Sequence, residues 1–288
     1  MYSSNVDYHR ATSLADAVKV LDKNKGARVL AGGHSLIPSM KLRVASPSML
    51  VDIGRIKSLS GIKVTKKEVR IGALTTHAAI AASPEIKEAC PILAEAAAQI
   101  ADPQVRNRGT IGGSLAQADP AADYPTLIIA LDAVLTATGP KGERQIEAKK
   151  FFKDLFTTAL KRDEILTSIT LPAYGNMPGM AGAYLKHRHP ASSYAVVGVA
   201  GMIGLEDGKV TRTVVVVGGA TANPVHAKAV ESALTGLEPT EDNIAAAVEK
   251  MDFEATLGDP YASAEYRAHL ARVMARKALM LAAQRAAG

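Results

Sequence analysis

The chain has 288 residues, of which 48% are hydrophobic, and its formal net charge is +6. This length suffices for one large domain or for two to three smaller ones. The longest apolar runs, such as residues 126–131, fall far short of the ~20 residues that cross a bilayer. The N-terminal segment carries charged residues where a secretory signal needs an unbroken apolar stretch. We therefore expect a cytoplasmic protein with no transmembrane segment.

The cysteine count and the charge pattern exclude two further classes. The single cysteine, Cys90, rules out an internal disulfide, an iron–sulfur cluster and a structural zinc site held by this chain's own thiolates. We interpret it as a buried residue at a helix start. Aromatic residues make up only 4%, and basic residues cluster only in the last predicted helix. Nucleic-acid binders usually concentrate both, so we expect no nucleic-acid role and a solvated or partner-facing last helix.

The first predicted elements form a strand–helix–strand unit. Ser13 can cap a helix over residues 13–26, in which apolar residues recur with helical spacing. Strands are expected at residues 27–31 and 50–53. Between them lies the segment AGGHSLIPSMKLR, which we expect to be a glycine loop followed by a short turn or helix interrupted by Pro38.

The rest of the chain mixes helices and strands. For the middle part we expect strands at 68–74 and 165–172, helices at 76–83, 90–101 and 124–131, the last capped by Asp123, a hairpin about 139–142, and a second glycine loop at 110–115. The glycine- and methionine-rich segment 173–183 is the best candidate for a domain boundary. Beyond it we expect an α/β domain with strands at 195–205 and 211–217 and helices near 224–234, 240–251 and 263–287.

The two glycine segments, Ala31–Ser35 and Thr110–Ser114, predict an anion site. Glycine lets backbone N–H groups converge on an anion at close range. A hydrogen bond to a charged group contributes roughly 1.5–3 kcal/mol, so two such loops could clamp a diphosphate that one loop grips only moderately. Taken alone, either segment is better explained as a tight turn that needs a positive φ. Neither matches the dinucleotide fingerprint or the phosphate loop of nucleotide triphosphatases.

Longer stretches make the interpretation specific. ARVLAGGHSLIPSMKLR, IADPQVRNRGTIGGSLAQADPAADYP and EILTSITLP closely resemble the FAD-binding medium subunit of the molybdenum hydroxylase family. The resemblance covers essentially the full chain. It implies an α+β protein with a two-subdomain FAD-binding fold of the vanillyl-alcohol-oxidase (PCMH) type over residues 1–175, divided near residue 55. A smaller C-terminal α/β domain, like that of the carbon monoxide dehydrogenase flavoprotein, would occupy residues 176–288.

The resemblance also implies a set of cofactor-binding residues. Asp123 would accept from the ribityl hydroxyls of FAD, whereas by pattern alone it is a helix cap. Leu166 would pack on the flavin ring, and Lys186 would place a cation near it; by pattern alone they are a core residue and a surface charge. Tyr194 would cover the ring. The full set is Ala31, Gly32, Gly33, His34, Ser35, Leu36, Ala101, Asp102, Thr110, Gly112, Gly113, Ser114, Asp123, Leu166, Lys186 and Tyr194.

Two departures and two histidines complete the set of candidates. Ser193 stands where the family often has an aspartate, and Ser114 where asparagine is frequent. His187 and His189 would share one face of a strand, but with no cysteine or carboxylate cluster nearby we expect no metal site. We nominate no catalytic acid, base or nucleophile.

The function implied by the resemblance is electron transfer by an oxidoreductase subunit. A large partner subunit with the molybdenum cofactor and a small one with two 2Fe-2S clusters would pass electrons to FAD, and an acceptor such as a quinone or dioxygen would receive them. The implied assembly is a dimer of three-subunit units. One alternative is a self-sufficient FAD-dependent oxidoreductase acting on a small organic substrate. Another is a nucleotide-binding or scaffolding module without redox use. The chain does not encode the substrate of the complex.

Overall fold

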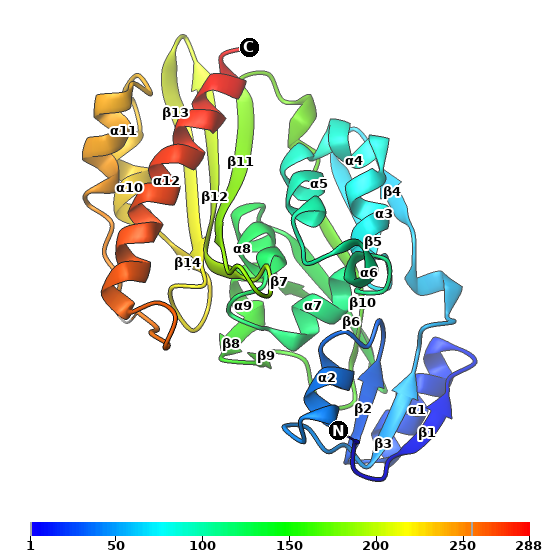
Figure 1. The fold of residues 1–288 in the computed structure, drawn as a ribbon. Coiled ribbons are helices and arrows are strands. Elements are labelled where there is room, and N and C mark those ends of the chain that lie inside the picture. The colour runs from blue at the N-terminus through cyan, green and yellow to red at the C-terminus, as the bar shows by residue number, and fades with distance from the viewer. Residues whose placement is uncertain (1, 255) are drawn as a thin grey trace.

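The computed structural model describes residues 2–254 and 256–288. Figure 1 shows three units in chain order: a small N-terminal unit in blue, a middle unit in cyan and green, and a C-terminal unit crossed by a long final helix in red. Helices and strands are both abundant, and each unit combines its own sheet with helices, which confirms the α+β class. None of the helices in these residues combines the length and the hydropathy of a membrane-spanning segment.

The N-terminal unit is a three-stranded parallel sheet with strand order β1-β3-β2. Its elements are β1 (Asp7–Arg10), α1 (Leu14–Lys23), β2 (Ala27–Leu30), α2 (Leu36–Lys41) and β3 (Met49–Asp52). The predicted helix cap is confirmed, because the Ser13 hydroxyl accepts from the backbone N–H of Asp16. Strand β1 was not predicted, since its DYHR sequence lacks the apolar alternation of a half-buried strand.

The middle unit is built on a five-stranded antiparallel sheet, β4-β5-β10-β6-β7. The strands of this sheet are β4 (Ile62–Val64), β5 (Glu68–Gly72), β6 (Val134–Gly139), β7 (Gly142–Glu147) and β10 (Ile165–Pro172), while β8 (Phe152–Asp154) and β9 (Thr157–Thr158) form a separate two-stranded sheet. The helices are η1 (Lys57–Leu59), α3 (His77–Ala82), α4 (Pro84–Ala89), α5 (Pro91–Ala98), α6 (Pro103–Arg106), α7 (Ile111–Gln117), α8 (Asp123–Ala130) and α9 (Ala148–Phe151). The predicted hairpin is confirmed, with Gly139 paired to Gly142. Cys90 is fully buried at the start of α5, as expected.

The C-terminal unit has a four-stranded antiparallel sheet, β11-β12-β13-β14. Its elements are η2 (Tyr174–Asn176), β11 (Met180–Arg188), β12 (Ala195–Glu206), β13 (Lys209–Gly218), β14 (Val225–His226), α10 (Lys228–Leu234), α11 (Glu241–Val248) and α12 (Ala264–Ala286). Strand β11 begins inside the glycine- and methionine-rich segment 173–183, where the sequence analysis expected a domain boundary and no strand. Glycine and alanine serve there as small strand residues: a Cβ on Gly182 would press against Met202 and Ile92.

Strand β12 is buried on both faces, and this joins the middle and C-terminal units. Ala200 and Met202 belong to the core that includes α5 and α8. Val199 and Ile203, on the opposite face, pack into the core formed with α10–α12. A strand buried on both faces carries a nearly continuous apolar run in place of alternation, as the sequence of β12 does. The sheet is therefore a layer between two sets of helices (Figure 1).

The last helix, α12, corrects the expectation of a solvated or partner-facing helix. One side of it lies across β11 and β12 (Figure 1), where Ala275, Ala278 and Leu279 are fully buried. The first basic residue of the cluster, Arg267, is also buried and donates to the carbonyl oxygens of Val196 (2.6 Å) and Gly219 (2.8 Å). Part of the basic cluster thus ties α12 to the ends of β12 and β13.

The packing of α8 on β13 gives a test of the shared layer. In Gly218→Ala, the new Cβ would lie 2.0 Å from Thr126 Oγ1. Overpacking of this kind costs ~1–3 kcal/mol, so urea titration should show a fall of that size in the free energy of unfolding. The Thr126 hydroxyl has no hydrogen-bond partner among the described residues. Thr126→Ala in the same background should therefore restore most of the loss, and no recovery would contradict this packing.

Candidate functional site

The first glycine segment presents a row of free backbone donors. It runs from the end of β2 into α2, and Gly33 has a φ of +77°, which favours glycine. Among the described residues, no acceptor takes a hydrogen bond from the successive N–H groups of residues 32–36. The same residues are half-buried to exposed, so a ligand can reach them. His34 Nδ1 lies 3.0 Å from the Gly32 oxygen, which holds the ring against its own loop.

The two glycine segments touch one another, as the sequence argument required. A Cβ on Gly32 would lie 2.1 Å from the carbonyl oxygen of Arg108. A Cβ on Gly113 would lie 3.8 Å from the Ala31 Cβ. Only a residue without a side chain allows the first of these approaches. The free donors of the first segment therefore lie directly beside the second segment.

The second segment differs from the expected loop of free donors. Residues 111–117 form helix α7, and the Thr110 hydroxyl caps it by accepting from the Gly113 N–H at 3.1 Å. The N–H of Gly112 donates to the Ala73 oxygen at 2.9 Å, and that of Ser114 to the Thr110 oxygen at 3.0 Å. The donors of this segment are thus already used. This segment can still contribute in two ways: its glycines let a ligand come close to the backbone, and the Ser114 hydroxyl makes no hydrogen bond to the described residues.

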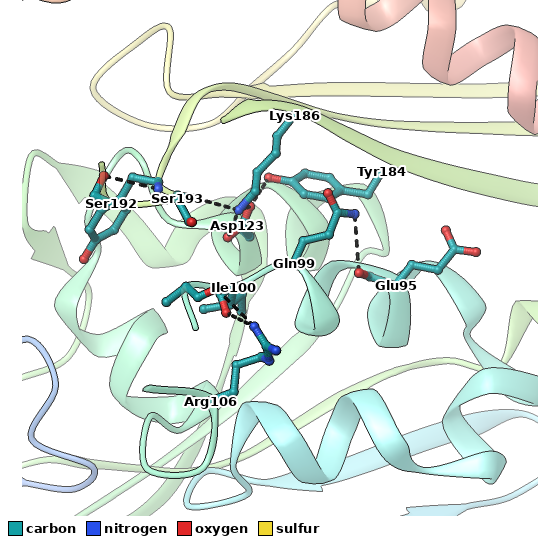
Figure 2. Close-up of polar contacts among 11 residues, drawn as sticks. Glu95, Gln99, Ile100, Arg106, Asp123, Tyr184, Lys186, Ser192 and Ser193 are labelled. Atoms are coloured by element: carbon teal, nitrogen blue, oxygen red, sulfur yellow. Dashed lines mark hydrogen bonds and ion pairs between the residues drawn. The ribbon is translucent and has the colours of Figure 1, made fainter. Parts of the chain in front are cut away.

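The turn before α6 is held by Arg106, which lies close in sequence to the second glycine segment. Arg106 Nη1 donates to the carbonyl oxygens of Ile100 (2.9 Å) and Ala101 (3.0 Å), as Figure 2 shows. Ala101 has a φ of +43°, which is unusual for a residue with a side chain. Asp102, which is exposed, caps α6 by accepting from the Val105 N–H at 2.8 Å. The candidate residues Ala101 and Asp102 therefore lie on a turn that Arg106 holds at one end and the Asp102 cap holds at the other.

Asp123 lies at the centre of a buried polar network. The prediction that it caps α8 was wrong: the cap position is Ala122, and the Asp123 carboxylate makes no capping bond. It accepts instead from the Tyr184 hydroxyl at 2.6 Å. Lys186 Nζ lies 3.0 Å from each of its two oxygens. Figure 2 shows both side chains converging on Asp123 from β11.

Lys186 is likewise misjudged by pattern alone, because its side chain is only 1% exposed. Its ammonium also donates to the Ser193 carbonyl oxygen at 2.8 Å. Burial raises the pKa of Asp123, and the neighbouring Lys186 charge opposes that rise. Burial lowers the pKa of Lys186, and Asp123 opposes that fall. Each charge thus offsets the cost of burying the other.

The remaining candidates occupy two different settings. Leu166 is buried in the core of the middle unit, next to a β-bulge in β10. Tyr194 lies on the turn between β11 and β12 and is 42% exposed. Burial and the nearby Asp119 raise the pKa of Tyr194, while the hydroxyl of Ser35 lowers it. The phenol therefore lies beside the first glycine segment.

The paired histidines make aromatic contacts. Strand β11 ends at Arg188, so His189 lies outside it and packs against Tyr261 with the two rings tilted and their centroids 4.4 Å apart. His187 contacts Tyr266 edge-on. Within residues 2–254 and 256–288, no group of three or more His, Cys, Asp or Glu side chains could hold a metal ion.

A buried histidine behind the second segment also escaped the sequence analysis. His77 is 5% exposed, and its Nδ1 lies 3.3 Å from the hydroxyl of the fully buried Tyr124. A Cβ on Gly109 would lie 2.6 Å from its Nε2, and its backbone N–H donates to the Gly109 oxygen. A helix was predicted at residues 76–83, and Thr76 caps it. The only local signal at His77 was therefore its place at the start of this helix.

Two family models match the chain. The model described as "FAD binding domain in molybdopterin dehydrogenase" matches residues 4–174, which is more than half of the chain. The model described as "CO dehydrogenase flavoprotein C-terminal domain" matches residues 182–282. The first match contains the N-terminal and middle units, and the second contains most of the C-terminal unit.

Similar proteins span the full chain. The carbon monoxide dehydrogenase medium chain of Afipia carboxidovorans is 38% identical over 290 residues, covering 99% of each chain. The 6-hydroxypseudooxynicotine dehydrogenase complex subunit alpha of Paenarthrobacter nicotinovorans is 38% identical over 292 residues, or 99% of this chain and 97% of that protein. A crystal structure of Cu,Mo-CO dehydrogenase contains a chain that superposes with a TM-score of 0.92 at 37% identity, covering 99% of this chain and 100% of that one.

The environment of His77 predicts a pH-dependent stability. Burial, reinforced by the neighbouring His34 and Arg106, lowers the pKa of His77 from 6.5 to about 4. Between these values the unfolded chain binds a proton that the folded chain does not, so stability falls as the pH decreases. Taking the pH from 7 to 5 should cost about 2 kcal/mol from this residue. Urea titrations of the wild type and of His77→Gln at both pH values measure it, and an equal pH dependence in the two proteins would contradict it.

Proposed function

Because the chain belongs to the family of FAD-binding medium subunits of the molybdenum hydroxylases, we propose that its two glycine segments hold the pyrophosphate of FAD beside the Asp123–Lys186 pair. The chain is an oxidoreductase subunit that carries FAD and transfers electrons. The residues that bind the cofactor, the assembly and the electron acceptor are the subject of the proposal.

The observation that carries the proposal is the run of free N–H groups at residues 32–36. A pyrophosphate is an anion with several acceptor oxygens, and successive backbone donors in a glycine loop suit it. Gly32 keeps this loop in contact with the Arg108 backbone, and no larger residue would fit there. The Ser35 and Ser114 hydroxyls can add further donors. The residues present therefore fit a dinucleotide.

Asp123 keeps limited capacity for the sugar chain of FAD. A carboxylate offers about four acceptor positions, and Tyr184 and Lys186 use several of them. One ribityl hydroxyl fits the remaining capacity. Bound FAD supplies the redox chemistry, since a flavin accepts electrons singly and releases one or two. This chain's residues bind it, orient it and shield it, and no acid or base on the chain is needed.

We further propose the partners that this role requires. On this proposal a large subunit with a molybdenum cofactor and a small subunit with 2Fe-2S clusters deliver electrons, as a dimer of three-subunit units in the cytoplasm. The relatives support this, because one is called a subunit of a dehydrogenase complex and another a medium chain. A quinone or dioxygen would accept the electrons. Native mass spectrometry of the complex from its host, combined with cell fractionation, tests the assembly and its location.

FAD titration of the purified chain tests the binding site. Gly32→Ala would push the two glycine segments apart, so we expect FAD affinity to fall by at least tenfold, measured by quenching of flavin fluorescence. Gly208→Ala is the control for strain alone: Gly208 lies in the β12–β13 turn with open space around it, but its φ of +75° makes an added Cβ unfavourable, and we expect FAD affinity to stay unchanged. Unchanged affinity in Gly32→Ala would overturn the assignment of the pyrophosphate site. Reduction of the flavin by a small organic compound in the isolated chain would favour a self-sufficient oxidoreductase.

A further inference from the structure

The turn between β11 and β12, residues 189–194, lies at the border between the C-terminal unit and the candidate cofactor site. Its frame is a pair of backbone bonds, from the Ser193 N–H to the His189 oxygen (2.9 Å) and from the His189 N–H to the Tyr194 oxygen (2.8 Å). Ser193 has a φ of +61°, a strained conformation for a residue with a side chain. A strained turn on the surface needs an external contact to keep its shape.

Lys186 supplies that contact. Its ammonium donates at once to the Ser193 carbonyl on the turn and to the Asp123 carboxylate on α8 (Figure 2). Asp123 is in turn held by the Tyr184 hydroxyl, two residues before Lys186 on β11. Arg188 is a further positive charge in the neighbourhood, and it acts on both members of the pair. The ammonium group of Lys186 therefore has its hydrogen bonds to Asp123 and to the Ser193 carbonyl of the turn.

The same turn reaches the first glycine segment. Tyr194 follows Ser193 directly, and its phenol lies beside the Ser35 side chain and Asp119. The next residue, Ala195, donates its N–H to the Ala121 oxygen at 3.0 Å, two residues before Asp123. The turn therefore lies between Asp123 and the segment with the free donors.

We propose that Asp123 and Lys186 form a latch that fixes the 189–194 turn of the C-terminal unit over the cofactor site. Lys186 is then a positioning residue, and not a cation presented to the flavin. The inference rests on the proposed function for the identity of the ligand, but the latch itself is a property of the chain alone. Loss of the Asp123–Lys186 pair should make the 189–194 turn more mobile, and as a consequence bound FAD should dissociate faster.

Hydrogen–deuterium exchange of the full chain without FAD tests the latch. In Lys186→Met we expect the amides of residues 189–194 to exchange at least tenfold faster, with β5 and β10 unchanged. Asp123→Asn, which keeps the shape of the side chain, should give the same pattern. The matched control is Lys209→Met, an exposed lysine on β13 of the same sheet. Because the latch joins two partners, the double variant should exchange no faster than Lys186→Met, and Lys186→Arg should partly restore protection.

Unchanged exchange in both single variants would overturn the latch. If the variants do not fold, acetylation of the wild-type chain decides: Lys186 should react at least tenfold more slowly than Lys209, and equal rates would overturn the latch. The FAD dissociation rate is a separate readout, expected to rise at least fivefold in Lys186→Met. If the wild-type chain binds no FAD, the proposed function fails while the exchange result still stands.

Discussion

The burial of the β11–β13 layer on both faces is the constraint on which the rest of the structure depends. Helices α5 and α8 of the middle unit cover one face, and α10–α12 cover the other. Each face buries aliphatic side chains, at ~25 cal/mol per Å² of apolar surface removed from water. Neither unit can move without exposing this surface. The end of β11 and the turn after it are therefore held at a fixed place beside α8.

That fixed placement is what makes a buried ion pair tolerable. A lone charge taken out of water costs several kcal/mol even after relaxation. Asp123 and Lys186 come from different units, so they can pair only if the start of α8 and the end of β11 are held close together. Tyr184 satisfies a further carboxylate lone pair, and the Ser193 carbonyl takes another ammonium proton. The layer supplies the geometry, and the polar network then selects one arrangement of the turn.

Much of the fold could be predicted from local pattern, and the failures have physical causes. The apolar run of β12 and the glycine hairpin at 139–142 were predicted because burial and turn formation leave a local signature. Strand β11 was missed because its small residues resemble linker composition, although Gly182 packs against Ile92 of α5 and Ala183 is buried in the core with α12. Helix α7 was missed because two glycines follow its Thr110 cap. Glycine is unfavourable inside a helix, by ~1 kcal/mol relative to alanine, but here close packing on Ala73 requires it.

The candidate site divides in the same way. The first glycine segment was predicted from a short motif, and its free donors follow from local backbone geometry. The pairing of Asp123 with Lys186 joins residues 63 positions apart, and no local pattern distinguishes such a lysine from a surface one. His77 escaped for the same reason, since its partner Tyr124 is 47 positions away. The resemblance to a family pointed to Lys186, but only the structure shows that its ammonium contacts Asp123 and the Ser193 carbonyl.

The candidate site draws on all three units, so FAD binding at the proposed residues would be linked to the stability of the whole chain. The first glycine segment belongs to the N-terminal unit, α7 and Asp123 to the middle unit, and Lys186 and Tyr194 to the C-terminal unit. A ligand that binds only the folded state stabilises it by about 2.7 kcal/mol at 100 times its Kd. The N–H groups of residues 32–36 have no partner among the described residues, so on the proposed assignment a bound pyrophosphate would satisfy donors that the folded chain leaves open. Cofactor binding and the docking of the N-terminal unit on the other two are therefore expected to stabilise one another.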